Sequence, residues 1–131
     1  MFDRMEKQES QTFHKTERLK SKKIIKELFA KGSSFFLYPF KVFYQPAPPG
    51  SPPQVLFSIP RRNFKKAVDR NKIRRRLRES YRRNKLLLND KAENDVSFLI
   101  AYIYISKEIL PYKEIEDKLK SSLKRLQKVK Y

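Results

Sequence analysis

Residues 61–85 read RRNFKKAVDRNKIRRRLRESYRRNK, and the periodicity within this stretch indicates a helix from about residue 66 to residue 84. At 100° per residue, one narrow sector of that helix collects the side chains suited to burial, which are Ile73, Leu77, Ser80, Tyr81 and Asn84. A stripe this narrow predicts that the helix packs on a core along one edge and leaves most of its circumference outside.

The opposite side of the same helix is strongly basic. The stretch holds thirteen lysines and arginines against Asp69 and Glu79, a local net charge of +11. Four side chains at spacings of four, three and four form a row flanked by Arg74, and they are Asn71, Arg75, Arg78 and Arg82. Like charges repel one another unless an anion lies along them, and arginine grips phosphates in a bidentate fork. The row therefore favours a nucleic-acid ligand over a merely solvated face, and the apolar side is too narrow for a membrane-surface helix.

Further elements are expected on both sides of the basic helix. The patterning predicts a helix over residues 22–31 that ends at Gly32, strands over 35–45, 55–60 and 95–105, and a helix over 112–129. The order is helix, two or three strands, helix, strand, helix, which is a small two-layer α+β sandwich. Residues 46–53 (PAPPGSPP) form a proline-rich loop, and residues 1–12 are expected to be a disordered segment.

Aromatic residues gather in the first third of the chain. They are Phe13, Phe29, Phe35, Phe36, Phe43 and Tyr44. Exposed rings near basic side chains provide stacking platforms for single-stranded nucleic acid, whereas a domain without tryptophan also needs aromatic rings in its core. Both interpretations stay open for most of these rings. Phe13 has the least reason to be buried, because it precedes the first helix among polar neighbours.

Composition limits the possible functions. The 131 residues include 32 lysines and arginines against 14 acids, a formal net charge of +18, which is typical of a polyanion binder. The chain has no cysteine and one histidine, His14, so thiolate chemistry, a histidine metal cage and a Ser–His–Asp triad are excluded. The longest apolar run, 96–105, is too short to span a bilayer and the N-terminus is polar. We therefore expect a cytoplasmic protein with no active site of its own.

The basic helix resembles that of the protein subunit of bacterial ribonuclease P. The likeness rests on residues 67–79 (AVDRNKIRRRLRE), where Lys72 stands in place of the family's arginine. Residues 13–19 (FHKTERL) and 29–32 (FAKG) also resemble the family's opening, so the likeness covers about Phe13 to Leu126. A non-enzymatic ribosomal or other structural RNA-binding protein is the alternative, because composition does not separate the two. A DNA-binding helix is less favoured, since no helix-turn-helix spacing precedes the basic helix.

The resemblance implies an RNA-binding subunit of an endoribonuclease that removes the 5′ leader from precursor tRNA. In that enzyme the RNA subunit carries catalysis with bound Mg²⁺, and the protein supplies no catalytic residue and holds no metal alone. The implied partners are the ribonuclease P RNA subunit and precursor tRNA, with no membrane and no protein partner evident. The implied fold is a single αβββαβα domain over residues 13–131, with a left-handed crossover.

The resemblance also implies two contact surfaces. Residues that would contact the catalytic RNA are Arg70, Asn71, Lys72, Arg74, Arg75 and Arg78, and the basic row adds Arg82. Residues that would line a groove for the precursor tRNA leader, between the first helix and the sheet, are Phe13, Phe29, Phe43, Lys41, Arg61 and Arg62.

Overall fold

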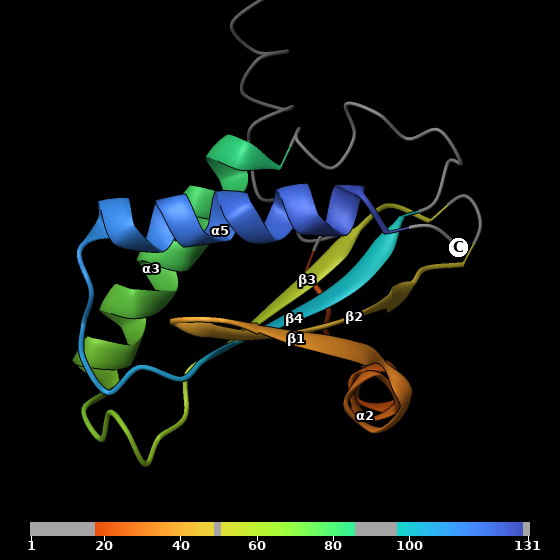
Figure 1. Ribbon diagram of the computed structural model, residues 1–131. Helices are drawn as coiled ribbons and strands as arrows, with labels where there is room; N and C mark the ends of the chain where they lie inside the picture. Colours follow the sequence, from red (N-terminus) through yellow and green to blue (C-terminus); the bar gives the residue numbers. More distant parts are fainter. Residues whose placement is uncertain (1–17, 49–50, 86–96, 130–131) are drawn as a thin grey trace, which may run out of the picture.

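The structure, a computed structural model, describes residues 18–48, 51–85 and 97–129 (Figure 1). In chain order its elements are α2 (Lys22–Lys31), β1 (Ser33–Leu37), β2 (Phe40–Pro46), β3 (Gln54–Ser58), α3 (Ala67–Asn84), β4 (Phe98–Tyr104) and α5 (Tyr112–Gln127). Three strands thus precede the basic helix and one follows it, which confirms the α+β order αβββαβα. The segment 1–12 lies outside the described residues, as do Phe13 and His14.

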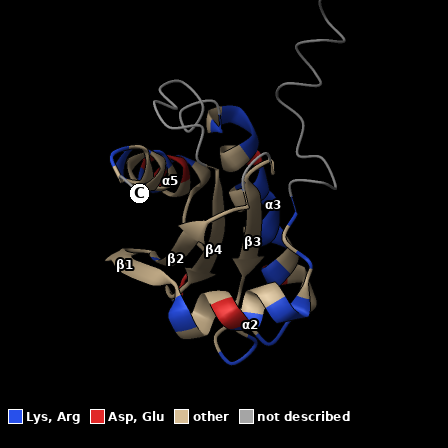
Figure 2. Ribbon diagram, turned by 90° about the vertical axis from the view of Figure 1, so that its right-hand side faces the viewer, with Lys and Arg blue, Asp and Glu red and all other residues tan. Residues whose placement is uncertain are grey.

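The strands form one four-stranded sheet in the order β1-β2-β4-β3. β1, β2 and β4 pair antiparallel, whereas β3 pairs parallel with β4. The parallel pair requires a crossover, and α3 provides it. Figures 1 and 2 together show that this crossover is left-handed, as the resemblance implies and against the general right-handed rule. Helices α3 and α5 cover one face of the sheet, and α2 lies on the other (Figure 1).

The main core lies between the sheet and the helix pair α3 and α5. Four of the five residues of the narrow stripe predicted on α3 are buried there, with Ile73, Leu77 and Tyr81 at most 1% exposed and Ser80 beside them. Asn84, at the end of the helix, is half-buried. From the sheet, Tyr102 is fully buried and its hydroxyl lies 2.7 Å from Ser122 Oγ on α5, so the polar tip has a partner inside the core. Burial raises the pKa of Tyr102 far above its ordinary value, so the phenol stays neutral.

A second, smaller core lies under α2. Its fully packed members are Leu19, Leu28, Leu99 and Ala101, with partly buried side chains such as Phe43 around them. The helix has ten residues, and Ser21 Oγ accepts a hydrogen bond from Ile24 N at its start. Because this core is small, the outer part of the same sheet face keeps side chains exposed, Phe36 at 66% among them.

Gly32 ends α2 as predicted, for a reason that differs from the usual left-handed cap. Its φ is −69°, which any residue adopts. A Cβ on Gly32 would clash with the Leu28 carbonyl oxygen of α2 itself and would lie 3.2 Å from the Tyr44 carbonyl oxygen of β2. Glycine is needed here because the chain leaves the helix close to its own last turn and beside β2.

The single strand predicted over residues 35–45 is wrong, because the segment is the hairpin β1–β2. Its turn contains a cis Tyr38–Pro39 peptide bond. Phe35 and Leu37 pack in or against the main core on odd positions, whereas Phe40 and Val42 are buried on even ones. Side chains of one strand alternate between faces with period two, so this change of phase requires a break in the strand.

The other boundaries differ by a few residues. The predicted strand 55–60 is Gln54–Ser58, the strand 95–105 is Phe98–Tyr104 within the described range, and the last helix ends at Gln127. The loop expected over 46–53 begins one residue late, because Pro46 is the last residue of β2 and lies opposite Phe98. Among the described residues, no helix is long and apolar enough to cross a membrane.

We predict that Gly32→Ala lowers the free energy of unfolding by about 1–3 kcal/mol, because the added methyl group meets backbone atoms on two sides. Urea unfolding at fixed ionic strength measures the loss. Lys31→Ala, at the exposed neighbouring position, is the matched control and should change stability by less than about 0.5 kcal/mol. Equal stability of Gly32→Ala and the control would contradict the close approach.

Candidate nucleic-acid interface

Helix α3 is rich in lysine and arginine (Figure 2). Asn71, Lys72 and Arg75 are exposed, and Arg78 is half-buried. Arg74 Nη1 donates a hydrogen bond to Asn71 Oδ1 over 3.1 Å, which orients both side chains along the helix surface. The predicted row is therefore present as a surface, and its exposed part runs from Asn71 to Arg75.

Arg70 has a role that the sequence did not predict. Its Nη1 donates to the Phe64 carbonyl oxygen at 2.7 Å and to the Lys65 carbonyl oxygen at 2.9 Å. These bonds tie the loop before α3 to the first turn of the helix. Arg70 thus holds the segment that carries Arg61 and Arg62, and part of its donor capacity is already used within the protein.

Arg82, at the far end of the row, is paired with Glu79. Its Nε donates to Glu79 Oε2 at 3.0 Å, and its Nη2 bonds the other carboxylate oxygen. The hydrogen bond from Arg82 lowers the pKa of Glu79, and the same bond raises the pKa of Arg82. A ligand phosphate would have to compete with this carboxylate, so Arg82 contributes less free charge to the row than Arg75 does.

Two further basic residues of α3 contact α5 and the connection that precedes it. Arg76 Nη1 donates to the Leu110 carbonyl oxygen at 2.5 Å, and Arg83 Nη1 lies 4.0 Å from Glu116 Oε2 on α5. These contacts fix α3 against the β4–α5 connection and α5. Positive charge on α3 therefore divides between a structural side and an outward side.

On the other face of the sheet, three of the residues predicted to line the leader groove, Phe29, Phe43 and Lys41, lie together. The rings of Phe29 on α2 and Phe43 on β2 meet edge to face, with centroids 4.9 Å apart. Lys41 Nζ lies 5.0 Å from the Phe43 ring centroid, within cation–π range. Phe29 is 36% exposed, so one ring of the pair is accessible to a base.

Phe36 is one of the aromatic residues noted in the first third of the chain, but it was not among the residues predicted to line the groove. It lies opposite Lys41 in the β1–β2 register, is 66% exposed, and places its ring centroid 5.0 Å from Lys41 Nζ. The sequence holds a signal for this position, which is the change in burial phase between Leu37 and Phe40. Once that change is interpreted as a hairpin turn, Phe36 falls on the same face of the sheet as Lys41.

Arg61 and Arg62 are exposed in the loop that follows β3. Ser58, the last residue of β3, lies opposite Ile103, and Ile103 lies opposite Lys41. The loop therefore leaves the sheet from the end at which Lys41 lies. Phe13, the remaining predicted groove residue, lies outside the described residues.

The described part of the chain contains no group of three or more histidine, cysteine, aspartate or glutamate side chains that could hold a metal ion. The interface is instead built from guanidinium, ammonium and aromatic groups. Such a surface neutralises phosphates and stacks on bases, which is the chemistry of RNA binding.

We predict that Glu79→Gln tightens binding of single-stranded RNA by about two- to fivefold at low salt, because it removes an anion from the row and releases Arg82. Fluorescence anisotropy with a labelled oligonucleotide measures the change. Asp117→Asn, which removes one exposed negative charge from α5, is the matched control. An equal gain in both variants would mean that only net charge matters and that the Arg82–Glu79 pair does not.

Comparison with known proteins now identifies the family. The ribonuclease P family model matches residues 13–127. A ribonuclease P protein component from Porphyromonas gingivalis is 36% identical over 118 residues, which cover 86% of this chain and 84% of that protein. One from Borrelia hermsii is 36% identical over 103 residues, covering 79% and 85%.

Solved structures agree with this assignment. The RNase P protein from Thermotoga maritima superposes with a TM-score of 0.68 at 28% identity, covering 83% of this chain and 96% of that one. The Staphylococcus aureus RNase P protein superposes with a TM-score of 0.69 at 21% identity, covering 86% and 96%, and supports the fold. These matches do not favour the alternative of a non-enzymatic structural RNA-binding protein. The chain belongs to the ribonuclease P family, as an RNA-binding protein subunit of the endoribonuclease that processes tRNA.

Proposed function

We propose that this subunit binds the ribonuclease P RNA through the outward face of α3 and the precursor tRNA leader through the groove between α2 and the sheet. The observation that carries the proposal is the exposed part of the α3 row, Asn71 to Arg75, where positive side chains lie together and none forms an ion pair with a carboxylate of the described residues. Such a face is self-repulsive in the free protein and is stabilised by a polyanion.

The role of the α3 face would be electrostatic. Folded RNA brings phosphates close together, and Mg²⁺ bound by the RNA relieves their repulsion. Lysine and arginine side chains along α3 would neutralise part of the phosphate charge that Mg²⁺ otherwise neutralises. The RNA would therefore reach its active form at a lower Mg²⁺ concentration. In this proposal catalysis and the Mg²⁺ ions belong to the RNA subunit, and the complex works in the bacterial cytoplasm.

The role of the groove would be to distinguish substrate from product. Phe29 and Phe43 offer ring faces and edges, and Lys41 adds a cation beside them. A single-stranded leader can stack on such rings, whereas mature tRNA has no leader to place there. Binding energy that precursor gains and product lacks favours release after cleavage. Arg61 and Arg62, near the same end of the sheet, would contact leader phosphates.

Phe36 would extend this groove along the hairpin. Lys41 Nζ lies 5.0 Å from both the Phe36 and the Phe43 ring centroids, so the two rings share one cation. A leader that crosses Phe43 would meet Phe36 next on the same face of β1 and β2. The sequence placed the groove at the first helix and strand, and Phe36 lengthens it toward the edge of the sheet.

The first test is cleavage of a precursor tRNA by a bacterial ribonuclease P RNA at low Mg²⁺, with and without this protein. We expect wild type to restore cleavage and Lys72→Ala/Arg75→Ala to lose about tenfold or more of that stimulation, because both residues are exposed on the row. The control Lys113→Ala/Lys124→Ala removes the same charge from α5. No stimulation by wild type would reject the proposed function, and equal stimulation by both double variants would reject the α3 contact.

The second test is the affinity of the reconstituted enzyme for precursor tRNA as the leader is lengthened by single nucleotides. We expect affinity to rise over the first few nucleotides, and Phe36→Ala to remove about tenfold of that gain for the longer leaders only, since stacking contributes about 1–3 kcal/mol per base. Tyr38→Ala is the control, as an exposed aromatic of the same hairpin whose hydroxyl bonds Ser106 instead. Affinity independent of leader length would contradict the groove.

A further inference from the structure

A cavity of about 330 Å³ lies between the segment before α2, strand β3 and helix α3. Basic side chains from two distant parts of the chain line it, and they are Arg18, Lys20, Arg74 and Arg78. The rest of its lining is apolar side chain and backbone, from Leu19, Val55, Leu56 and Phe57. The exposed residues Lys72 and Arg75 of the α3 row do not line it.

The cavity is built by backbone pairing and not by chance proximity of long side chains. Arg18 forms a parallel β-bridge with Val55, and Leu19 N donates to the Val55 carbonyl oxygen at 3.0 Å. The segment is thereby fixed along the free edge of β3. This attachment places Arg18 and Lys20 on the opposite wall from Arg74 and Arg78, which α3 holds through its buried stripe.

The guanidinium of Arg78 is a partly buried charge in the lining of the cavity. Its Nε is buried and has no hydrogen-bond partner in the described structure. Burial, together with the nearby charges of Arg18 and Arg74, lowers the pKa of Arg78. Three guanidinium groups that crowd one cavity, one of them with an unused buried donor, are stabilised by an anion placed among them.

The shape and lining of the cavity indicate what that anion is attached to. A cavity of this volume is at the lower end of the range for small-molecule sites, which suits one nucleotide. A free inorganic anion would contact only the basic side chains of the cavity and would leave its apolar lining unused. The partly buried side chain of Leu56 gives the cavity an apolar floor that a ribose or a base can cover, while guanidinium groups bind phosphate oxygens in bidentate geometry.

We propose that this cavity binds one nucleotide of single-stranded RNA, with its phosphodiester between Arg18, Arg74 and Arg78 and its ribose or base on the apolar floor. The inference rests on the proposed RNA-binding function and divides its surface further. Arg74 and Arg78 serve the cavity, whereas Asn71, Lys72 and Arg75 serve the exposed row. Arg18 and Lys20 become binding residues, although neither belongs to the basic helix.

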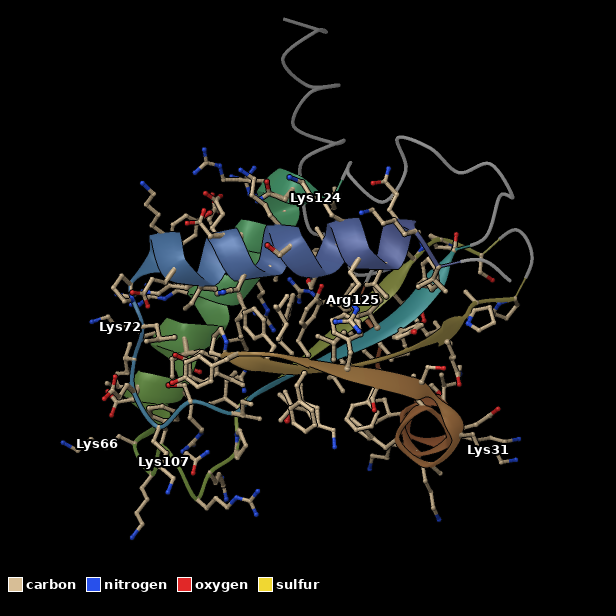
Figure 3. All side chains as sticks on the ribbon, viewed as in Figure 1. Lys31, Lys66, Lys72, Lys107, Lys124 and Arg125 are labelled. Atoms are coloured by element: carbon tan, nitrogen blue, oxygen red, sulfur yellow. The ribbon has the colours of Figure 1, made fainter. Side chains whose placement is uncertain are left out.

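The test uses a labelled single-stranded RNA pentamer, oligo(U), and the full-length protein. We expect Lys20→Gln and Arg18→Gln each to weaken binding by about tenfold and to lower the salt slope by about 0.7, the value for one single-strand phosphate contact. Lys124→Gln is the matched control, because Lys124 lies on the side of α5 away from the sheet (Figure 3). Equal affinities for the Lys20 and Lys124 variants would overturn the proposal.

A second measurement does not depend on how a variant folds. The Nε–Hε signal of Arg78 in the wild-type protein, identified by its loss in Arg78→Lys, is followed by NMR while the pentamer or inorganic phosphate is added. We expect a saturating shift with the pentamer at concentrations where inorganic phosphate produces little. No shift with the pentamer would overturn the site, and equal shifts at equal concentrations would reduce it to an anion site without a nucleotide.

Two affinities of the Arg18→Gln variant show which RNA supplies the nucleotide. The first is the affinity of the variant for ribonuclease P RNA alone. The second is the affinity of the enzyme assembled with the variant for precursor tRNA with and without a leader. Weakened binding to the RNA subunit assigns the nucleotide to that subunit, and weakening that appears only with a leader assigns it to the substrate. Unchanged binding in both arms, with stimulation of cleavage at low Mg²⁺ intact, rejects the cavity and leaves the proposed function standing. Wild type that fails to stimulate cleavage rejects the function whatever the pentamer shows.

Discussion

The packing of α3 through a narrow apolar stripe is the constraint on which the rest of the structure depends. The helix is mostly charged, and Ile73, Leu77 and Tyr81 are the side chains that hold it on the sheet and α5. All three belong to one core cluster that also contains side chains of the sheet and of α5. A wider stripe would have stabilised the fold further and would have removed positions for arginine. The width of the apolar stripe thus affects how firmly α3 is held, and the surface that the stripe leaves free is where basic side chains can meet RNA.

The two faces of the sheet are covered to different extents, and the proposed leader groove lies on the less covered face. Two helices cover one face, whereas the ten-residue α2 lies on the other and buries a small core around Leu28. Phe36 and Lys41 lie on the uncovered part of that face. An aromatic ring at 66% exposure is unfavourable in water, so its place beside a cation and a second ring is better explained by a ligand than by folding.

Sequence reasoning predicted the elements whose signal is local. The stripe of α3, the end of α2 at Gly32 and the burial of β4 follow from periodicity and composition, and the structure confirms them. The β1–β2 hairpin was missed because a run of aromatic and β-branched residues was interpreted by composition while the change of phase at Pro39 was not. The roles of Arg70 and Arg82 could not be predicted, because each depends on a partner whose position only the folded chain fixes.

The distribution of lysine and arginine over the interface has a physical explanation in burial. Arg74 and Arg78 lie at the inner edge of α3, where desolvation and like charges lower the pKa of Arg78. A guanidinium starts from a higher pKa than an ammonium, so it retains its charge more readily under such a shift. Lys72 and Lys20 are exposed, so their side chains lie in water and not in the partly buried surroundings of Arg78. Lys72, which stands in place of the family's arginine, therefore lies at an exposed position. A positive charge is needed there, but the ability of arginine to stay charged when buried is not.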